Sequence, residues 1–225
     1  MDTKIDPFIS RLLPPRKQTI SSSTPYFRCV TEFQAYLSFG FDHIFNIGAY
    51  DHILFIATLA VAYSLTSWRR MILILTAFTV GHSITLALSA LDFFSLNSTL
   101  VEVLIACTIL VAATYNLLLK KHALITNPRI LIHYIIAIFF GLIHGLGFAM
   151  QFRALMGSGR EVLRALFAFN LGVELGQIVV IAIFLCMLYL LTYVLKLRHQ
   201  TLSIIISLLA GLTAIFLIVQ RLQNL

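Results

Sequence analysis

Residues 163–195 decide the fold, and they read LRALFAFNLGVELGQIVVIAIFLCMLYLLTYVL. A run of about 20 apolar residues is enough to cross the hydrocarbon core of a bilayer as an α-helix. This run is longer, and its only charged side chains are Arg164 near one end and Glu174 well inside it. An ionisable side chain within a membrane helix costs about 2.5–3.5 kcal/mol, so it usually marks a functional position. The segment therefore predicts a membrane-spanning helix that carries part of a buried polar site.

The same pattern recurs from Tyr50 to the C-terminus, where apolar runs alternate with charged breaks. These runs predict helices over Ala49–Thr66, Met71–Leu91, Thr99–Leu119, Ile130–Met150, Leu163–Leu195 and Thr201–Arg221. A weaker stretch, Val30–Ile47, is interrupted by charged residues and is an interfacial helix, a re-entrant segment or a seventh span. We therefore expect an all-α polytopic membrane protein with a bundle of about six transmembrane helices, formed by residues 30–225. Residues 1–29 are polar and basic, which predicts a flexible tail or a membrane-surface segment.

Composition agrees with a membrane protein, because 60% of the residues are hydrophobic, only 11% are charged and the mean hydropathy is +0.95. Soluble domains carry about 25% charged residues. The net charge of +7 comes mainly from short basic loops, including Arg69-Arg70, Lys120-Lys121 with Arg129, and Lys196 with Arg198. Such loops face the cytoplasm under the positive-inside rule and meet anionic lipid headgroups, so the charge does not indicate nucleic-acid binding. The three cysteines are far apart and predict neither disulfides nor a thiolate metal site.

Polar residues within the predicted helices form the candidate site. They are Asp51, His52, His82, Ser83, His144, Asn170, Glu174 and Gln177. Because successive helices cross the membrane in alternating directions, Asp51, His52, His82, His144 and Glu174 fall at one depth, in the outer half of the bilayer. Four predicted helices therefore converge on one level.

Helical spacing groups these side chains further. Asn170, Glu174 and Gln177 share one face of their helix, and Thr79, His82 and Ser83 share a face of another. Imidazole and carboxylate groups suit a borderline divalent ion such as Zn(II), Ni(II) or Co(II), whereas Cu(I) prefers sulfur ligands. The predicted metal ligands are Asp51, His52, His82, His144 and Glu174, with His43, Asn170, Gln177 and Thr79 in support. The alternative for any single residue is a hydrogen bond that fixes helix packing. Glu102, at a helix start on the outer side, is either a solvated cap or a carboxylate on the path of an ion.

Four ordered motifs resemble the HupE/UreJ family of bacterial membrane proteins. They are GAYDHILF at residues 48–55, TAFTVGHSITL at 76–86, GLIHGLGFA at 141–149 and FNLGVELGQ at 169–177. Members are usually described as permeases for nickel or other metals, linked to the maturation of metalloenzymes. The resemblance implies that Asp51, His52, His82, His144 and Glu174 are the family's functional polar positions, and that the chain is a multi-pass protein of the bacterial inner membrane.

Three functions remain open on the sequence. The first is a divalent-metal permease in which the cluster forms a transient site and Glu174 exchanges protons. The second is an intramembrane zinc-dependent hydrolase or transferase with a lipid or protein substrate, in which Glu174 or Ser83 takes part in catalysis. The third is an assembly protein whose polar cluster only fixes helix packing. A permease requires a polar route to the inner face, for which Asn116 and His133 are the main candidates beyond the cluster.

Overall fold

The computed structural model describes residues 25–46, 50–63, 65–90, 97–118, 130–155 and 162–223, and every regular element among them is helical. The α-helices are α2 (Pro25–Phe45), α3 (Tyr50–Ala62), α4 (Trp68–Ala90), α5 (Ser98–Leu118), α7 (Ile130–Leu155), α8 (Val162–Tyr189) and α9 (His199–Leu222). A short 3-10 helix, Leu65–Ser67, precedes α4, and a π-helical turn, Leu190–Val194, extends α8. The expected all-α polytopic fold is confirmed.

The expected number of spans is also confirmed, because five helices are long and apolar enough to cross a membrane and a bent pair of helices adds a sixth candidate. The bent pair joins Glu32–Phe45 to Tyr50–Ala62 at an angle of 68°. The predicted helix Ala49–Thr66 was too long at its end, because α3 stops at Ala62 after 13 residues. Hydroxyl-bearing residues follow this point in the sequence, and such side chains compete for backbone hydrogen bonds. At 1.5 Å per residue α3 reaches only about 20 Å, too short for a membrane.

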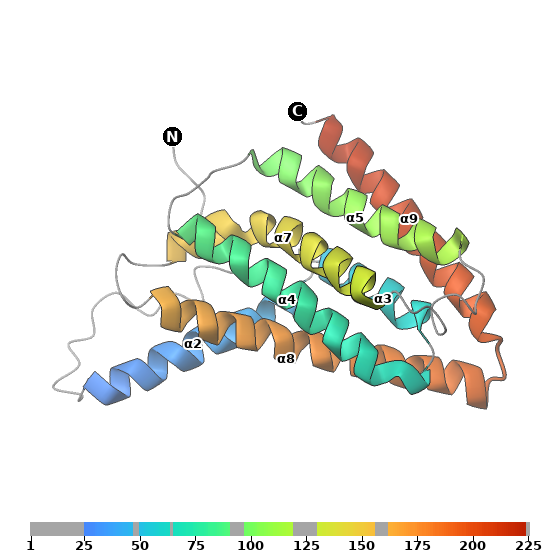
Figure 1. The fold of residues 1–225 in the computed structure, drawn as a ribbon, viewed down its shortest axis with the longest axis horizontal. Coiled ribbons are helices and arrows are strands. Elements are labelled where there is room, and N and C mark those ends of the chain that lie inside the picture. Colours follow the sequence, from blue (N-terminus) through green and yellow to red (C-terminus); the bar gives the residue numbers. More distant parts are fainter. Residues whose placement is uncertain are drawn as a thin grey trace.

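The weak stretch Val30–Ile47 lies largely within α2, which is the first half of the bent candidate span. Helix α2 runs parallel to α8, since Phe33 packs on Phe167 and Phe39 packs on Phe169. Helices α2 and α3 both advance from left to right in Figure 1, as α8 does. This common direction favours one broken span over a re-entrant loop. The predicted tail overlaps the start of α2 at residues 25–29, and its first 24 residues lie outside the described part of the chain.

Glycines bring two parallel helix pairs into backbone contact. A methyl group on Gly81 of α4 would overlap the carbonyl oxygen of Ile138 in α7, and one on Gly141 of α7 would overlap the carbonyl oxygen of Phe78. Gly40 of α2 is similarly close to the backbone of α8. Small residues allow such close packing in membranes, where van der Waals contact contributes much of the helix association. The α4–α7 and α2–α8 pairs therefore form the frame of the bundle.

A third pair, α5 and α9, packs antiparallel across the frame at the top of Figure 1. Arg221 near the end of α9 forms an ion pair with Glu102 near the start of α5. At the other end of the pair, Asn116 Nδ2 donates to Ser207 Oγ at 3.3 Å. Short helix α3 lies between this pair and the frame, contacting both α5 and α9. The N-terminal end of α3 is thus enclosed by other helices.

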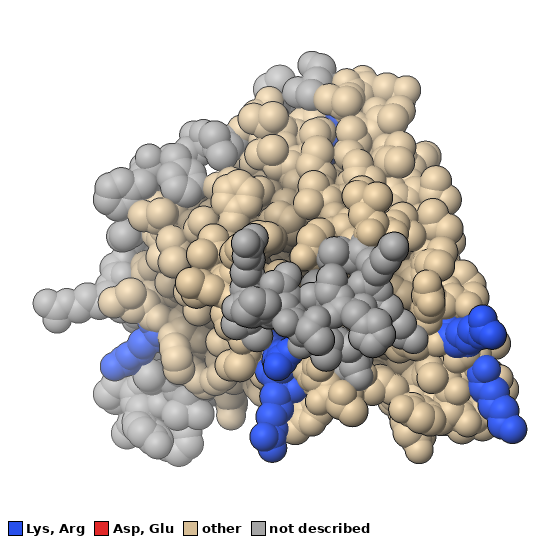
Figure 2. Space-filling view, turned by 45° about the vertical axis from the view of Figure 1, so that its right-hand side comes forward, with Lys and Arg blue, Asp and Glu red and all other residues tan. Residues whose placement is uncertain are grey.

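Four exposed basic residues lie at one end of the bundle. Arg69 and Arg70 open α4, and Lys196 and Arg198 lie between α8 and α9; all four are exposed. In Figure 2 most of the blue Lys and Arg side chains in view lie along the lower edge, and no red carboxylate is visible. Apolar side chains such as Leu163, Leu212 and Phe216 are exposed along the helices. This distribution is that of a multi-pass membrane protein. The predicted loop residues Lys120, Lys121 and Arg129 lie outside the described residues.

Candidate metal centre

Four histidines from four helices meet inside the bundle. His43 comes from α2, His52 from α3, His82 from α4 and His144 from α7. The His52 ring centroid lies 5.0 Å from that of His43, 5.9 Å from that of His82 and 5.2 Å from that of His144. His52 is therefore the centre of the cluster. The structure brings together the three histidines that the sequence singled out, and His43, predicted only as a supporting residue, joins them.

The potential ligand atoms form two overlapping groups. One ligand atom each from His43, His52 and His82 lies within 4.8 Å of the others, and so does one each from Asp51, His52 and His144. Atoms bound to one zinc ion stand about 2.0–2.2 Å from it, so ligands around a common ion are about 3–4 Å apart. Small side-chain rotations would bring either group to that spacing. The two groups share His52, which links the two positions.

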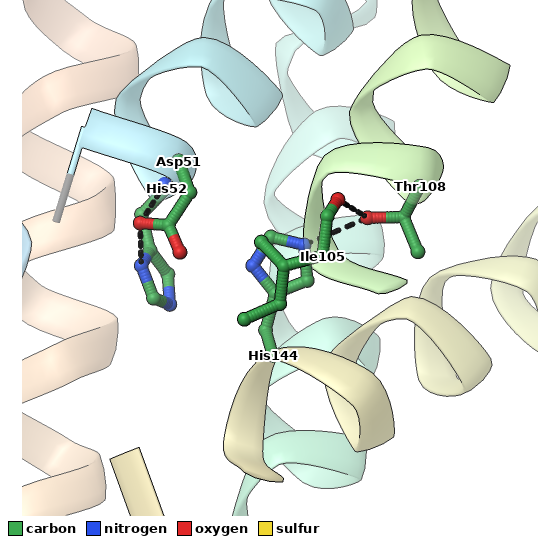
Figure 3. A network of polar contacts seen from close by, with 5 residues as sticks. All are labelled: Asp51, His52, Ile105, Thr108 and His144. Carbon is green, nitrogen blue, oxygen red and sulfur yellow. Dashed lines mark hydrogen bonds and ion pairs between the residues drawn. The ribbon is translucent and has the colours of Figure 1, made fainter. Parts of the chain in front are cut away.

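Two of the histidines are oriented by a hydrogen bond on one ring nitrogen. Asp51 Oδ1 lies 3.1 Å from His52 Nδ1, and a carboxylate can only accept, so His52 carries its proton there. Thr108 Oγ1 donates to the Ile105 carbonyl at 2.7 Å and lies 2.9 Å from His144 Nε2. Because a hydroxyl has one proton, Thr108 accepts from His144 Nε2–H. The opposite nitrogens, His52 Nε2 and His144 Nδ1, are left as lone-pair donors. Figure 3 shows these contacts, with the two rings held on facing helices.

Buried nitrogens without partners distinguish this cluster. Within the cluster, five imidazole nitrogens are buried without a hydrogen bond: His43 Nε2, His52 Nε2, His82 Nδ1, His82 Nε2 and His144 Nδ1. The residues His52, His82 and His144 are 2%, 0% and 1% exposed. An unsatisfied buried polar group costs about 1–3 kcal/mol. Several such groups in one place are expected where a ligand completes the coordination.

A cavity of about 160 Å³ reaches this cluster. Its lining includes His43, Asp51, His52, His144, Tyr50, Glu102, Gln151 and Arg221. Phe148 and Phe169 cover another side of the cluster, with the Phe148 ring centroid 4.2 Å from that of His43. The site is therefore a polar pocket enclosed by aromatic rings, and its lining chemistry is nitrogen and oxygen rather than sulfur.

The other predicted residues lie on the α4–α8 contact. Glu174 belongs to neither potential ligand group, and its Oε1 accepts a hydrogen bond from Thr76 Oγ1 at 2.6 Å. Thr79 Oγ1 lies 3.0 Å from Gln177 Oε1, and Ser83 Oγ donates to the Thr79 carbonyl at 2.7 Å. Asn170 donates to the Leu166 carbonyl, which leaves its buried Oδ1 without a hydrogen bond. These groups support the helix contact beside the histidines.

A second cavity of about 120 Å³ lies beyond Phe55. Its lining is mainly apolar, and its polar members are Thr58, Tyr63, Tyr115, Asn116 and His133. The Phe55 ring centroid is 4.8 Å from that of Phe78 and 6.0 Å from that of His144. Phe55 and Phe78 thus stand between the metal centre and this inner cavity. Asn116 and His133, the sequence candidates for an inner route, both line it.

Sequence reasoning missed Thr108 and Phe55. A threonine within an apolar helix more often bonds its own backbone, which Thr108 also does, so nothing in the sequence marks its contact with His144. Phe55 belongs to a run of apolar residues, and only the packing of α3 against α4 identifies it as a barrier. Both roles depend on tertiary contacts.

Comparison with known proteins gives the family. No curated protein and no solved structure matches this sequence. The family model described as HupE / UreJ protein matches residues 17–221, which is nearly the whole chain. The match contains all four motifs and every histidine of the cluster. The chain therefore belongs to the HupE/UreJ family.

Proposed function

We propose that this protein is a permease for a divalent transition metal and that the histidine cluster binds the ion transiently during transport. The observation that carries the proposal is the set of five buried imidazole nitrogens without hydrogen-bond partners. They come from four helices and face one another around His52. Packing alone would leave these groups at a net cost, whereas a bound cation would satisfy them. Membership of the HupE/UreJ family supports a role in metal transport.

The donor atoms indicate which metals are carried. Imidazole nitrogen with a carboxylate suits Ni(II), Co(II) and Zn(II), whereas Mg(II) prefers all-oxygen sites and Cu(I) prefers sulfur. Among the described residues, neither potential ligand group contains a cysteine, and the lining of the cavity includes neither methionine nor cysteine. We therefore propose nickel, cobalt or zinc as the substrate. In a bacterial cell such an ion would supply the maturation of a metalloenzyme.

The two overlapping ligand groups suggest how the ion moves. An ion held by His43, His52 and His82 can pass to Asp51, His52 and His144 without leaving His52. Asp51 holds the proton of His52 on Nδ1 in the first position and becomes a ligand in the second. Two ligand groups that share His52 suit transport, because the ion must leave the site as well as enter it. Glu174, on the neighbouring helix face, is our candidate for proton exchange.

The inner cavity supplies the next stage of the route. It lies on the other side of Phe55 and Phe78 from the metal centre, and its lining includes Asn116 and His133. Movement of the two rings would connect the metal centre with the inner cavity. The rings would then act as the inner gate that alternating access requires. We place the protein in the bacterial inner membrane, with its basic end in the cytoplasm and the metal centre in the outer half of the bilayer. No observation specifically favours the hydrolase.

Metal flux into vesicles tests the proposal. The purified full chain is reconstituted into liposomes that enclose a metal-sensitive dye, and Ni(II), Co(II), Zn(II) or Mg(II) is added outside. We expect saturable uptake of one or more of the transition metals and none of Mg(II). His52→Ala should abolish uptake, because His52 belongs to both ligand groups.

Cys186→Ala is the matched control, since it removes an exposed thiol from α8 that could bind metal adventitiously. This variant should transport like the wild type. Tight, stoichiometric metal binding without flux would contradict the permease and favour a resident metal. Equal flux through wild type and His52→Ala would contradict the assigned site.

A further inference from the structure

The cavity of the metal centre carries an ion pair on its more exposed side. Glu102 of α5 and Arg221 of α9 both line this cavity, together with His52 and His144. Their side chains are 38% and 35% exposed, whereas His52 and His144 are almost fully buried. Solvent therefore reaches the ion pair before it reaches the imidazoles.

The position of Glu102 on α5 connects it with the site. Glu102, Ile105 and Ile109 line the cavity on one face of the helix. The carbonyl of Ile105 accepts the hydrogen bond from Thr108, which in turn holds His144. A cation that follows this face from Glu102 arrives at the imidazoles after about two helical turns, or roughly 10 Å.

A guanidinium on this path requires an explanation. An unpaired Arg221 would repel an entering divalent cation, and the repulsion would be strong in a confined space of low dielectric constant. Glu102 cancels that charge in the resting structure. A divalent ion attracts the carboxylate more strongly than a single positive charge does, and oxygen is an acceptable ligand for nickel, cobalt and zinc.

We propose that Glu102 is the first ligand of an entering divalent metal ion and that Arg221 screens it until the ion displaces the guanidinium. This inference rests on the proposed permease function and adds a selectivity step to it. A monovalent cation carries the same charge as Arg221, so its attraction to the Glu102 carboxylate is weaker than that of a divalent ion. The alternative is a purely structural ion pair that joins α5 to α9 and complements the C-terminal dipole of α9.

Opposite effects of two single variants distinguish these roles. The rate of Ni(II) association with the purified full chain is followed by stopped flow, with a metallochromic indicator for the free ion. Glu102→Gln leaves Arg221 charged and should slow association roughly tenfold, whereas Arg221→Gln leaves Glu102 free and should accelerate it roughly tenfold. A structural ion pair predicts that both variants change the rate in the same direction or not at all.

Two controls complete the experiment. Glu102→Asp keeps the carboxylate and should associate faster than Glu102→Gln. Arg69→Gln removes one exposed positive charge at the start of α4, away from the ion pair, and should leave the rate unchanged. If the wild type binds metal normally and the two test variants change the rate in the same direction or not at all, the proposal for Glu102 is overturned. The metal site itself would not be affected by that result. Absence of binding in every protein, including the wild type, would overturn the metal site and the proposal together.

Discussion

Two histidine sites lie on opposite sides of Phe55, and they differ in how their ring nitrogens are satisfied. In the inner cavity, His133 Nδ1 lies 3.1 Å from the Tyr63 hydroxyl and His133 Nε2 lies 3.2 Å from the Tyr115 hydroxyl. In the metal centre, neither nitrogen of His82 has a hydrogen-bond partner. One bundle therefore contains a histidine with a partner at both ring nitrogens and a histidine with a hydrogen bond at neither.

The hydrogen bonds of the ring nitrogens separate the candidate metal ligands from His133. Buried polar groups are normally paired, and even the partly buried His133 has a partner at each ring nitrogen. A metal at His133 would have to displace a tyrosine hydroxyl, whereas at His82 the Asn170 side chain is nearby but no such hydrogen bond is formed. His133 is partly buried near the start of α7 and His82 is fully buried in the middle of α4, and the hydrogen bonds of their ring nitrogens add a second difference.

Loss of a ligand should have the largest effect. His82→Ala removes a member of the first ligand group, and we expect metal affinity to fall by more than the 10–100-fold typical of groups that only orient a ligand. His133→Ala, the matched variant in the inner cavity, should leave the affinity unchanged. Equilibrium titration of both purified proteins with Ni(II) measures the difference. A similar loss in both variants would remove the distinction between the two sites.

The helix frame that holds the metal centre gives the second prediction. Gly81→Ala places a methyl group against the carbonyl oxygen of Ile138, so α4 and α7 must separate, which should destabilise the protein by about 1–3 kcal/mol. His82 and His144 move apart with these helices, so metal affinity should also fall. Gly211→Ala on α9 is the control, because its nearest contact would be Ala113 Cβ at 3.6 Å. Unfolding in mixed micelles compares the two, and equal stability would contradict the tight α4–α7 contact.

The sequence predicted the helical bundle and the meeting of its histidines for identifiable physical reasons. Long apolar runs report spanning helices directly, and the alternation of their directions placed His52, His82 and His144 at one depth. The end of α3 was missed, because the apolar run that precedes it outweighed the hydroxyl-bearing residues that follow Ala62. The 68° bend between α2 and α3 also escaped prediction, and this bend brings His43 to His52.

The finer parts of the site depend on contacts between helices that are distant in sequence. Glu174 shares a face with Asn170 and Gln177, as its spacing indicated, but its bond to Thr76 separates it from both potential ligand groups. Periodicity identifies the face of a helix, whereas the register against the next helix decides which side chains meet. Thr108 illustrates the same point, since its partner is 36 positions away.

The orientation of His144 gives a third, smaller prediction. Thr108→Val removes the hydroxyl that accepts from His144 Nε2–H, and we expect metal affinity to fall about tenfold, the lower limit for a residue that orients a ligand. Thr108→Ser keeps the hydroxyl and should retain most of the affinity. Titration with Ni(II) and Zn(II) measures both variants. Equal affinities for valine and serine would show that Thr108 does not set the proton of His144.

The smallest effect is expected at the inner cavity. Tyr63→Phe removes one of the two hydrogen bonds of His133, and the loss of a hydrogen bond of this kind should lower the free energy of unfolding by about 1 kcal/mol. Metal affinity should not change, because Phe55 and Phe78 separate Tyr63 from the ligand groups. Unfolding and Ni(II) titration of the same preparation measure both quantities. A fall in metal affinity with unchanged stability would mean that the tyrosine contacts the ion, and His133 would then belong to the transport path as a second binding position.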